Sequence, residues 1–424
     1  MKFSLQKGTK DILPDEIHRW QKAEKIFASV AEQYGFREIR IPTFEQTELF
    51  TRGVGDSTDV VRKEMYTFDD KGGRSITLRP EGTAGVVRSF IENGMSSLAG
   101  PVRLYYNITA FRYEKMQKGR FREFHQFGLE AFGSKGPQID AEVISILVLF
   151  FERMGLSQTQ LRINSIGCPT CRVTYHEKLK SYFSETVSGM CGDCKVRFEI
   201  NPLRMLDCKE EYCHTLTAKA PRQIDFLCEE CQSHFDGLKS SLDTLGIQYV
   251  VDSGIVRGLD YYTRTVFEFV SEHVGTQGTI CGGGRYDKLI ESMGGSSVPG
   301  IGFAMGVERF LLEADAQGIV IDKENAVQLY LANFSEETRE YCQKLAYGLR
   351  RAGIGCETDV MGRSFRAQLK YAGKAEIPFM AVIGTDEINA GIIRLKRMSD
   401  GFESELSASD FTAEALQIIK NNSL

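Results

Sequence analysis

The distribution of cysteines divides this sequence before any other pattern does. The chain has 11 cysteines among 424 residues, and eight of them lie between Cys168 and Cys231. These eight form four closely spaced pairs: Cys168/Cys171, Cys191/Cys194, Cys208/Cys213 and Cys228/Cys231. The concentration marks residues 168–240 as a module with its own folding constraint, inserted between segments of different composition.

The spacing within these pairs is typical of zinc sites built from four thiolates, and a module this small would gain stability from a bound metal. Order along the chain favours two sites, one from Cys168, Cys171, Cys191 and Cys194 and one from Cys208, Cys213, Cys228 and Cys231. Reduced structural cysteines that bind no metal are equally compatible with the pattern.

The compartment follows from the apolar segments. The N-terminus, MKFSLQKGTKDILPDEIHRW, has no apolar stretch after its first lysine, as a secretory signal would require. The most apolar run, residues 143–151, is too short to cross a bilayer. We therefore expect a cytoplasmic protein without membrane contact, in which the cysteines stay reduced.

Hydrophobic periodicity predicts an α+β fold. A helical pattern over residues 13–35 precedes a strand over 36–44, and a second helical pattern covers 139–155. Strand patterns over 104–114 and 122–133 follow each other with only a short basic stretch between them. We therefore expect an antiparallel sheet flanked by helices rather than a series of β-α-β units.

The C-terminal part has a different organisation. From about Ala326, strand and helix patterns alternate over roughly a hundred residues, a common domain size. The sequence thus predicts one domain over 1–325, with the cysteine-rich insertion at 168–240 inside it, and a small α/β domain over 326–424.

Polar residues on the strand over 122–133 suggest a ligand site. Period two places Gln126, Gly128 and Glu130 on one face. A glycine between two polar side chains leaves a slot in which a small ligand can approach the backbone. A solvated sheet face with an incidental glycine would show the same pattern.

Positive charge follows on the neighbouring strand and its connection. Arg112 and Glu114 are expected on one strand face, where an arginine would form a fixed fork for phosphate oxygens. The connecting residues 115–122 concentrate basic side chains on a hairpin tip that can meet a polynucleotide. An ordinary surface ion pair and a solvated turn are the structural alternatives.

Two strand-to-helix junctions are further candidates for ligand binding. Residues 77–83 contain Glu81 and Thr83, and Thr83 suits a helix N-cap. Residues 302–312 place Arg309 in the first turn of a helix, where free amide groups favour an anion. Capping alone would also explain the first junction. The P-loop pattern GxxxxGK[ST] does not occur in the sequence.

Together these stretches resemble known motifs. EIRIPTFEQTELF, FRYEKMQKGRFREFHQFGLEAFG and GIGFAMGVERF are similar to motifs 1, 2 and 3 of class II aminoacyl-tRNA synthetases. RGLDYYTRTVFEF and GGGRYD resemble two stretches peculiar to the histidyl-tRNA synthetase family, in which TLRPEGT also occurs at the matching place. The blocks follow the family's order, from about Lys7 into the C-terminal domain.

The resemblance implies a class II catalytic domain with a C-terminal anticodon-binding domain. It also implies ATP-dependent ligation of L-histidine to tRNA-His through histidyl-adenylate, with Mg²⁺, in a homodimer whose interface motif 1 builds. The alternative within the family is a paralogue that serves as a regulatory subunit of ATP phosphoribosyltransferase in histidine biosynthesis. That paralogue lacks the C-terminal domain, which is present here.

Matched position by position, the resemblance implies residue roles. The catalytic arginines would be Arg257 and Arg112. Histidine would be bound by Glu81, Thr83, Gln126, Glu130, Tyr261, Tyr262 and Tyr286. ATP would be bound by Arg112, Glu114 and Arg309, and tRNA by Gln117, Lys118, Arg120, Arg363, Arg366 and Lys370.

The charge balance fits a tRNA partner only when it is resolved along the chain. Lys and Arg total 52 and Asp and Glu total 57, a net charge of −5 that alone argues mildly against a nucleic-acid partner. The basic residues concentrate at 115–122 and 363–374, so the average conceals two local basic surfaces.

Overall fold

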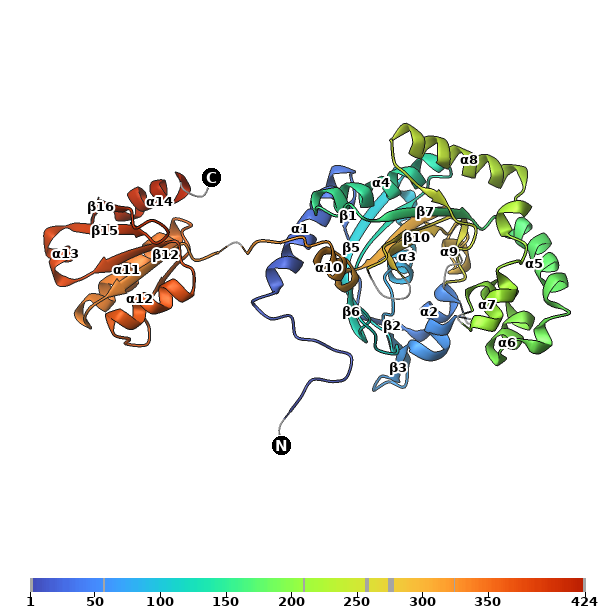
Figure 1. The fold of residues 1–424 in the computed structure, drawn as a ribbon, viewed down its shortest axis with the longest axis horizontal. Coiled ribbons are helices and arrows are strands. Elements are labelled where there is room, and N and C mark those ends of the chain that lie inside the picture. The colour runs from blue at the N-terminus through green and yellow to red at the C-terminus, as the bar shows by residue number, and fades with distance from the viewer. Residues whose placement is uncertain are drawn as a thin grey trace. The chain divides into compact units, whose positions relative to one another are not determined.

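The chain divides into two units, residues 1–322 and 323–424. The structure is a computed structural model, and it describes residues 3–55, 58–208, 210–255, 259–273, 278–323 and 325–421. Each unit has its own sheet and its own apolar core (Figure 1).

An eight-stranded sheet forms the centre of the first unit. Its strand order is β1-β5-β6-β11-β10-β9-β7-β8, and all neighbours are antiparallel except the outermost pairs β1/β5 and β7/β8. In that order the strands are Arg37–Glu38, Val102–Phe111, Glu123–Phe132, Gly300–Gly306, Thr279–Arg285, Thr263–Val270, Gln160–Ser165 and Val250–Val251. The predicted α+β class with an antiparallel sheet flanked by helices is confirmed.

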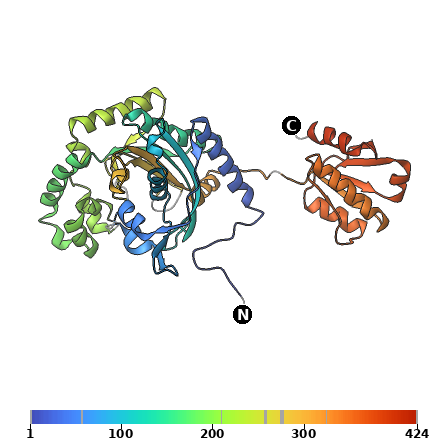
Figure 2. The ribbon, with the colours of Figure 1, turned by 180° about the vertical axis from the view of Figure 1, so that it is seen from behind.

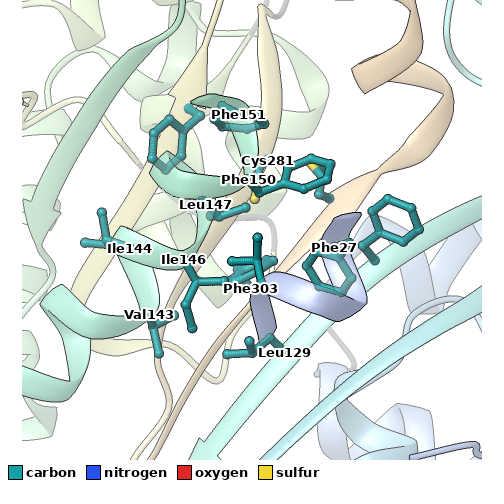
Figure 3. Close-up of a cluster of buried hydrophobic side chains, with 14 of the residues drawn as sticks. Phe27, Leu129, Val143, Ile144, Ile146, Leu147, Phe150, Phe151, Cys281 and Phe303 are labelled. Carbon is teal, nitrogen blue, oxygen red and sulfur yellow. The ribbon is translucent and has the colours of Figure 1, made fainter. Parts of the chain in front are cut away.

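Long helices bury one face of this sheet, as the view from behind also shows (Figure 2). They are α1 (Ile17–Gln33), α4 (Pro137–Arg153), α8 (Glu229–Thr244) and α10 (Val307–Ala316). Phe27 of α1 stacks on Phe127 of β6 with ring centroids 4.8 Å apart, and Phe150 of α4 packs edge-on against both. Figure 3 shows Phe27 and Phe150 in this cluster of buried side chains. This core uses the apolar side of the alternation in β6, so the polar side faces the other way.

The opposite face carries shorter elements. They are α2 (Thr47–Val54), α3 (Thr83–Glu92), α9 (Leu289–Ser292) and a small sheet of β2 (Phe44–Gln46), β4 (Ser75–Leu78) and β3 (Tyr66–Asp69). The prediction of one strand over 36–44 is wrong, because the chain leaves β1 after Glu38 and enters β2 only at Phe44. Pro42 cannot donate to a strand ladder, and its carbonyl and that of Ile41 accept instead from the Arg79 guanidinium, at 3.1 and 2.6 Å.

The cysteine-rich insertion is helical. It comprises α5 (Pro169–Phe183), α6 (Gly192–Ile200) and α7 (Glu211–Thr217) and leads into α8. The four-cysteine groups are Cys168, Cys171, Cys228 and Cys231, and Cys191, Cys194, Cys208 and Cys213. The pairing predicted from chain order is therefore wrong: the first and last pairs meet where the insertion leaves and rejoins the sheet, and the two middle pairs meet within it.

The second unit contains a five-stranded mixed sheet in the order β13-β12-β14-β15-β16. Its strands in chain order are β12 (Leu329–Asn333), β13 (Cys356–Thr358), β14 (Phe379–Ile383), β15 (Ile392–Arg397) and β16 (Glu403–Ser407). Its helices are α11 (Glu337–Arg351), α12 (Phe365–Lys374), α13 (Thr385–Ala390) and α14 (Phe411–Asn421). The parallel connections around β12 give the alternating strand and helix pattern seen in the sequence.

Arg363 does not belong to the basic helix face on which its spacing from Arg366 and Lys370 placed it. It precedes α12, its amide donates to the fully buried Asp359 carboxylate at 2.8 Å, and its guanidinium lies over the Tyr371 ring. Arg366 and Lys370 are on α12 and exposed.

Within the described ranges, the structure has no helix that combines the length and the apolar composition needed to cross a membrane.

Candidate active site

A cavity of about 220 Å³ lies against β6, β10 and β11 of the large sheet. The residues singled out in the sequence that line it are Glu81, Thr83, Arg112, Glu114, Arg120, Gln126, Tyr261, Tyr262, Tyr286 and Arg309. They come from widely separated segments of the first unit, so the fold alone brings them together. One end of the cavity has a buried acid and phenols, and the other has arginines.

Glu130 lies beneath the acidic end and is fully buried. Its Oε1 accepts hydrogen bonds from the hydroxyls of Thr83 at 2.8 Å and Tyr106 at 3.1 Å, and its Oε2 accepts from the hydroxyl of Tyr286. Burial raises the pKa of Glu130 to about 8, although the three hydroxyl donors favour the ionised form. One more hydrogen-bond donor to this carboxyl group would lower its pKa and favour its ionised form.

Glycines make room for this arrangement. A Cβ at Gly302 would fall inside van der Waals contact with Glu130, and a Cβ at Gly128 would overlap the Tyr106 ring. Gly128 stands directly opposite Tyr106 in the β5/β6 register. Gln126, Gly128 and Glu130 lie on the face away from the Phe127 core, and the phenol of Tyr106 fills the space over Gly128.

Glu81 fixes the start of α3. Its two carboxylate oxygens accept from the amides of Thr83 and Ala84, both at 2.8 Å. The prediction of Thr83 as N-cap is wrong, since Gly82 holds the cap position and Glu81 supplies the capping oxygens. The Thr83 hydroxyl is thereby free to turn toward Glu130. Burial raises the pKa of Glu81.

Three arginines line the other end. Arg112 donates from Nε to the Pro80 carbonyl at 2.8 Å, and Arg120 pairs with Glu114 at 3.0 Å. Arg309 lies in the first turn of α10 and donates to the Thr279 carbonyl. Burial and the nearby Arg120 charge lower the pKa of Arg309. Three guanidinium groups at one end of the cavity provide donors for the oxygens of a polyanion, with Glu114 and Glu308 as the carboxylates beside them.

The connection after β5 differs from its prediction. β5 ends at Phe111, so Arg112 and Glu114 follow the strand rather than lie on it. The Arg112 amide still donates to the Arg122 carbonyl at 2.9 Å, which holds its position. Gln117 and Lys118 are exposed at the hairpin tip, whereas Arg120, predicted to contact tRNA, lines the cavity.

Comparison with known proteins bears directly on this site. The histidyl-tRNA synthetase family model matches residues 8–169 and 210–310, and an anticodon binding domain model matches 327–418. A histidine–tRNA ligase from Acetivibrio thermocellus is 56% identical over 401 residues, covering 95% of this chain and 96% of the relative. The chain belongs to the histidyl-tRNA synthetase family.

Further relatives agree with that membership. A histidine–tRNA ligase from Caldanaerobacter subterraneus subsp. tengcongensis is 52% identical, covering 94% of this chain and 96% of the relative. The crystal structure of apo S. aureus histidyl-tRNA synthetase superposes with a TM-score of 0.84 at 38% identity, covering 97% of this chain and 99% of that one. The class II synthetase fold with an anticodon-binding domain is thus established for this chain.

Several residues of the site are not predicted from the sequence, and one predicted site residue lies outside the described structure. Tyr106 donates to Glu130 but was treated as part of an ordinary strand, and Phe124 lines the cavity beneath the Arg112 guanidinium. The available signal for Tyr106 was the glycine opposite it. Arg257 lies outside the described residues.

The Gln126 side chain, which lines the cavity, has a polar atom without a hydrogen-bond partner among the described residues. Its Oε1 is buried and accepts no hydrogen bond from any described residue. A buried acceptor of this kind is rarely left unsatisfied, so a ligand donor in the cavity would complete it.

The raised pKa of Glu130 predicts a pH effect on stability. A carboxyl whose folded pKa lies near 8 contributes stability that is fully present below its unfolded pKa and is lost as pH rises to about 8. The free energy of unfolding should therefore decrease between pH 5 and 8.5 in the wild type more than in Glu130→Gln. The two decreases should differ by at least ~1 kcal/mol. Urea denaturation across this range measures both slopes, and parallel slopes would contradict the assignment.

Proposed function

We propose that this chain ligates L-histidine to tRNA-His, using ATP, through a histidyl-adenylate intermediate and with release of AMP and pyrophosphate. The observation that carries the proposal is the cavity with two chemically different ends, a buried carboxyl group with phenols and a cluster of arginines. The relatives that share more than half of this sequence over nearly its full length are named histidine–tRNA ligases.

Histidine fits the acidic end. A neutral imidazole offers one N–H donor and one acceptor nitrogen, which a carboxylate and a phenol can satisfy together. Glu130 would accept the N–H, and Tyr262, with Tyr261 and Tyr286 beside it, would complete the pocket. A fourth donor to Glu130 would lower its pKa and ionise it as the ligand binds.

The amino acid backbone would meet the residues around α3. Glu81 and Thr83 would take the ammonium group, and the unsatisfied Gln126 side chain would contact the carboxylate end. A site built from such hydrogen bonds rejects analogues that leave its groups unpaired, by roughly 10⁴-fold. Selectivity for histidine would then need no separate editing site.

The arginine end would carry out the adenylation step. The histidine carboxylate attacks the α-phosphorus of ATP, forming a C–O–P bond as the bond to pyrophosphate breaks. Arg112 would hold the α-phosphate and Arg309 the γ-phosphate, so charge on the phosphoryl oxygens is stabilised by fixed donors. Arg257 would act beside the reacting carboxylate, as the family resemblance implies.

Mg²⁺ would accompany ATP. Carboxylate oxygens are the ligands it prefers, and Glu114 and Glu308 line the cavity. The ion would neutralise charge on the phosphates there.

The second step requires tRNA. The terminal ribose hydroxyl of tRNA-His would attack the histidyl carbonyl and displace AMP. Gln117 and Lys118 at the exposed hairpin tip, with Arg120 behind them, would face the acceptor end. The 326–424 domain would bind the anticodon region through Arg366 and Lys370, which fits the anticodon-binding family match.

The regulatory-subunit alternative is not favoured. A binding module for histidine would need no arginine cluster next to the histidine pocket, and this chain has Arg112, Arg120 and Arg309 there. We also propose a cytoplasmic location, where tRNA is charged.

A homodimer is the proposed assembly, with the motif 1 region at its interface. Phe44 and Phe68 on the small sheet are exposed to 56% and 48%, although both are large apolar side chains. Light scattering should give about twice the mass of the 47.6 kDa chain, and a monomer at micromolar concentration would contradict this assembly.

Arg112→Ala tests the proposed reaction. The wild-type protein should show histidine-dependent ATP–pyrophosphate exchange and should charge tRNA-His. The variant should lose roughly 10²- to 10³-fold in kcat for exchange, because a fixed donor to the reacting phosphate is gone. Arg103→Ala, on β5 but paired with Glu142 away from the cavity, is the matched control. Equal exchange rates in both variants would remove Arg112 from its role.

A charge reversal on α12 tests tRNA recognition. Arg366→Glu with Lys370→Glu should raise the KM for tRNA-His roughly 10-fold or more, since each lost phosphate contact weakens binding. ATP–pyrophosphate exchange should stay unchanged. Arg394→Glu, an exposed arginine on β15, provides the control on another element of the same unit. An unchanged KM for tRNA would contradict the assignment of α12.

A further inference from the structure

The two cysteine groups of the insertion have the geometry of four-thiolate metal sites. In each group the four Sγ atoms lie within 4.8 Å of one another. Cys168 Sγ is 3.6 Å from Cys171 Sγ and 4.0 Å from Cys228 Sγ, and Cys191 Sγ is 3.7 Å from Cys208 Sγ. These separations are too long for disulfides and agree with the ~3.8 Å edge of a tetrahedron with Zn–S bonds of about 2.3 Å.

The surroundings of the sulfur atoms suit bound thiolates. Cys168, Cys191 and Cys228 are the N-cap residues of α5, α6 and α8, so three helix N-termini point toward the sulfur clusters. Backbone amides also donate to sulfur: Cys228 N to Cys171 Sγ at 3.1 Å, and Cys191 N to Cys213 Sγ at 3.3 Å. Both features favour the net negative charge of a zinc ion with four thiolates.

The two sites differ in location. The group Cys168, Cys171, Cys228 and Cys231, the neck site, joins the first turns of α5 and α8, where the insertion begins and ends. The group Cys191, Cys194, Cys208 and Cys213, the distal site, lies among the apolar side chains of the insertion itself. The neck site lies close to the large sheet along the chain, since β7 ends at Ser165, three residues before Cys168.

Both halves of the neck site contact one short segment that lines the cavity. Arg172 follows Cys171 and donates to the Tyr262 carbonyl, and Glu230, between Cys228 and Cys231, pairs with Arg264 at 2.5 Å. Arg264 has a φ of 52°, a left-handed backbone conformation that non-glycine residues rarely adopt. Ile166 and Gly167, just before Cys168, hold it with backbone hydrogen bonds of 2.8 Å.

We propose that the insertion binds two zinc ions, and that the ion in the neck site positions Tyr262 for histidine through Arg172. The distal ion stabilises only the insertion. Metal binding stands on the cysteine geometry alone, whereas the effect on histidine rests on the proposed function. Arg172 is a positioning residue, since it contacts the backbone of Tyr262 and not the ligand.

Metal analysis of the purified full-length protein tests the first part. The wild type should contain two zinc ions per chain, one for each group. Cobalt-substituted wild type should show the visible absorption of tetrahedral thiolate coordination, which requires no variant to fold. A folded, active wild type with neither zinc nor that cobalt spectrum would overturn the proposal.

Paired variants test the second part. Cys228→Ser with Cys231→Ser should lose one zinc and raise the KM for histidine in ATP–pyrophosphate exchange roughly 10-fold, with the KM for ATP unchanged. Cys208→Ser with Cys213→Ser should also lose one zinc but leave the KM for histidine unchanged. Arg172→Ala should keep both zinc ions and raise the KM for histidine as the neck variant does.

The outcomes separate the two proposals. Equal KM values for histidine in the neck and distal variants, or an unchanged KM in Arg172→Ala, would overturn the positioning role. A wild type that contains two zinc ions but shows no histidine-dependent exchange would overturn the proposed function and leave the metal sites intact. Circular dichroism of each variant identifies loss of folding, in which case Arg172→Ala and the cobalt spectrum decide.

Discussion

The buried carboxyl group of Glu130 is the constraint on which the architecture of the site depends. A carboxyl group without solvent contact must be neutral or hydrogen-bonded, and here it receives hydroxyl donors from Thr83, Tyr106 and Tyr286. These donors come from α3, from β5 and from the turn after β10. Satisfying one side chain thus fixes the relative positions of three elements that are far apart in the sequence.

A buried ion pair holds the segment that carries Tyr286. Arg285, next to Tyr286, is fully buried and pairs with the equally buried Asp140 of α4 at 2.5 Å. His234 of α8 is 2.8 Å from the same carboxylate. Arg285, Asp140 and His234 are all buried, so removal of one of them would leave a buried charge without its partner. The turn that presents Tyr286 to Glu130 is therefore anchored to the helix that ends the insertion.

Periodic patterns in the sequence predicted the structure correctly where the environment of a single helix or strand determines it. Period two on β6 correctly separated Phe127 from Gln126 and Glu130, because each strand face has one environment. The pattern failed where a hydrogen bond or contact outside the periodic pattern decides the local structure. Glu81 displaced Thr83 as the cap of α3, Asp359 removed Arg363 from the α12 face, and the cysteine pairs joined across the insertion rather than along it. Glu81 and Asp359 lie only two and four residues from the groups they bind, so there a competing local hydrogen bond overrode the pattern. The pairing of cysteines that are 57 residues apart leaves no short-range signal.

The two ends of the cavity differ in charge, and this difference determines how the proposed substrates would be oriented in it. In the proposed function, the cationic end attracts the phosphates of ATP, whereas phosphates moved into the buried acidic end would lose their hydration without a cation to pair with. Histidine, with a donor on its ring and an ammonium group, would be favoured at that end. The carboxylate of histidine is then the one part of that ligand drawn toward the arginines, which directs it at the α-phosphate. Under the proposed function, a chain with a net charge of −5 binds ATP and tRNA, both polyanions, because the position of the charges and not their total determines what each surface attracts.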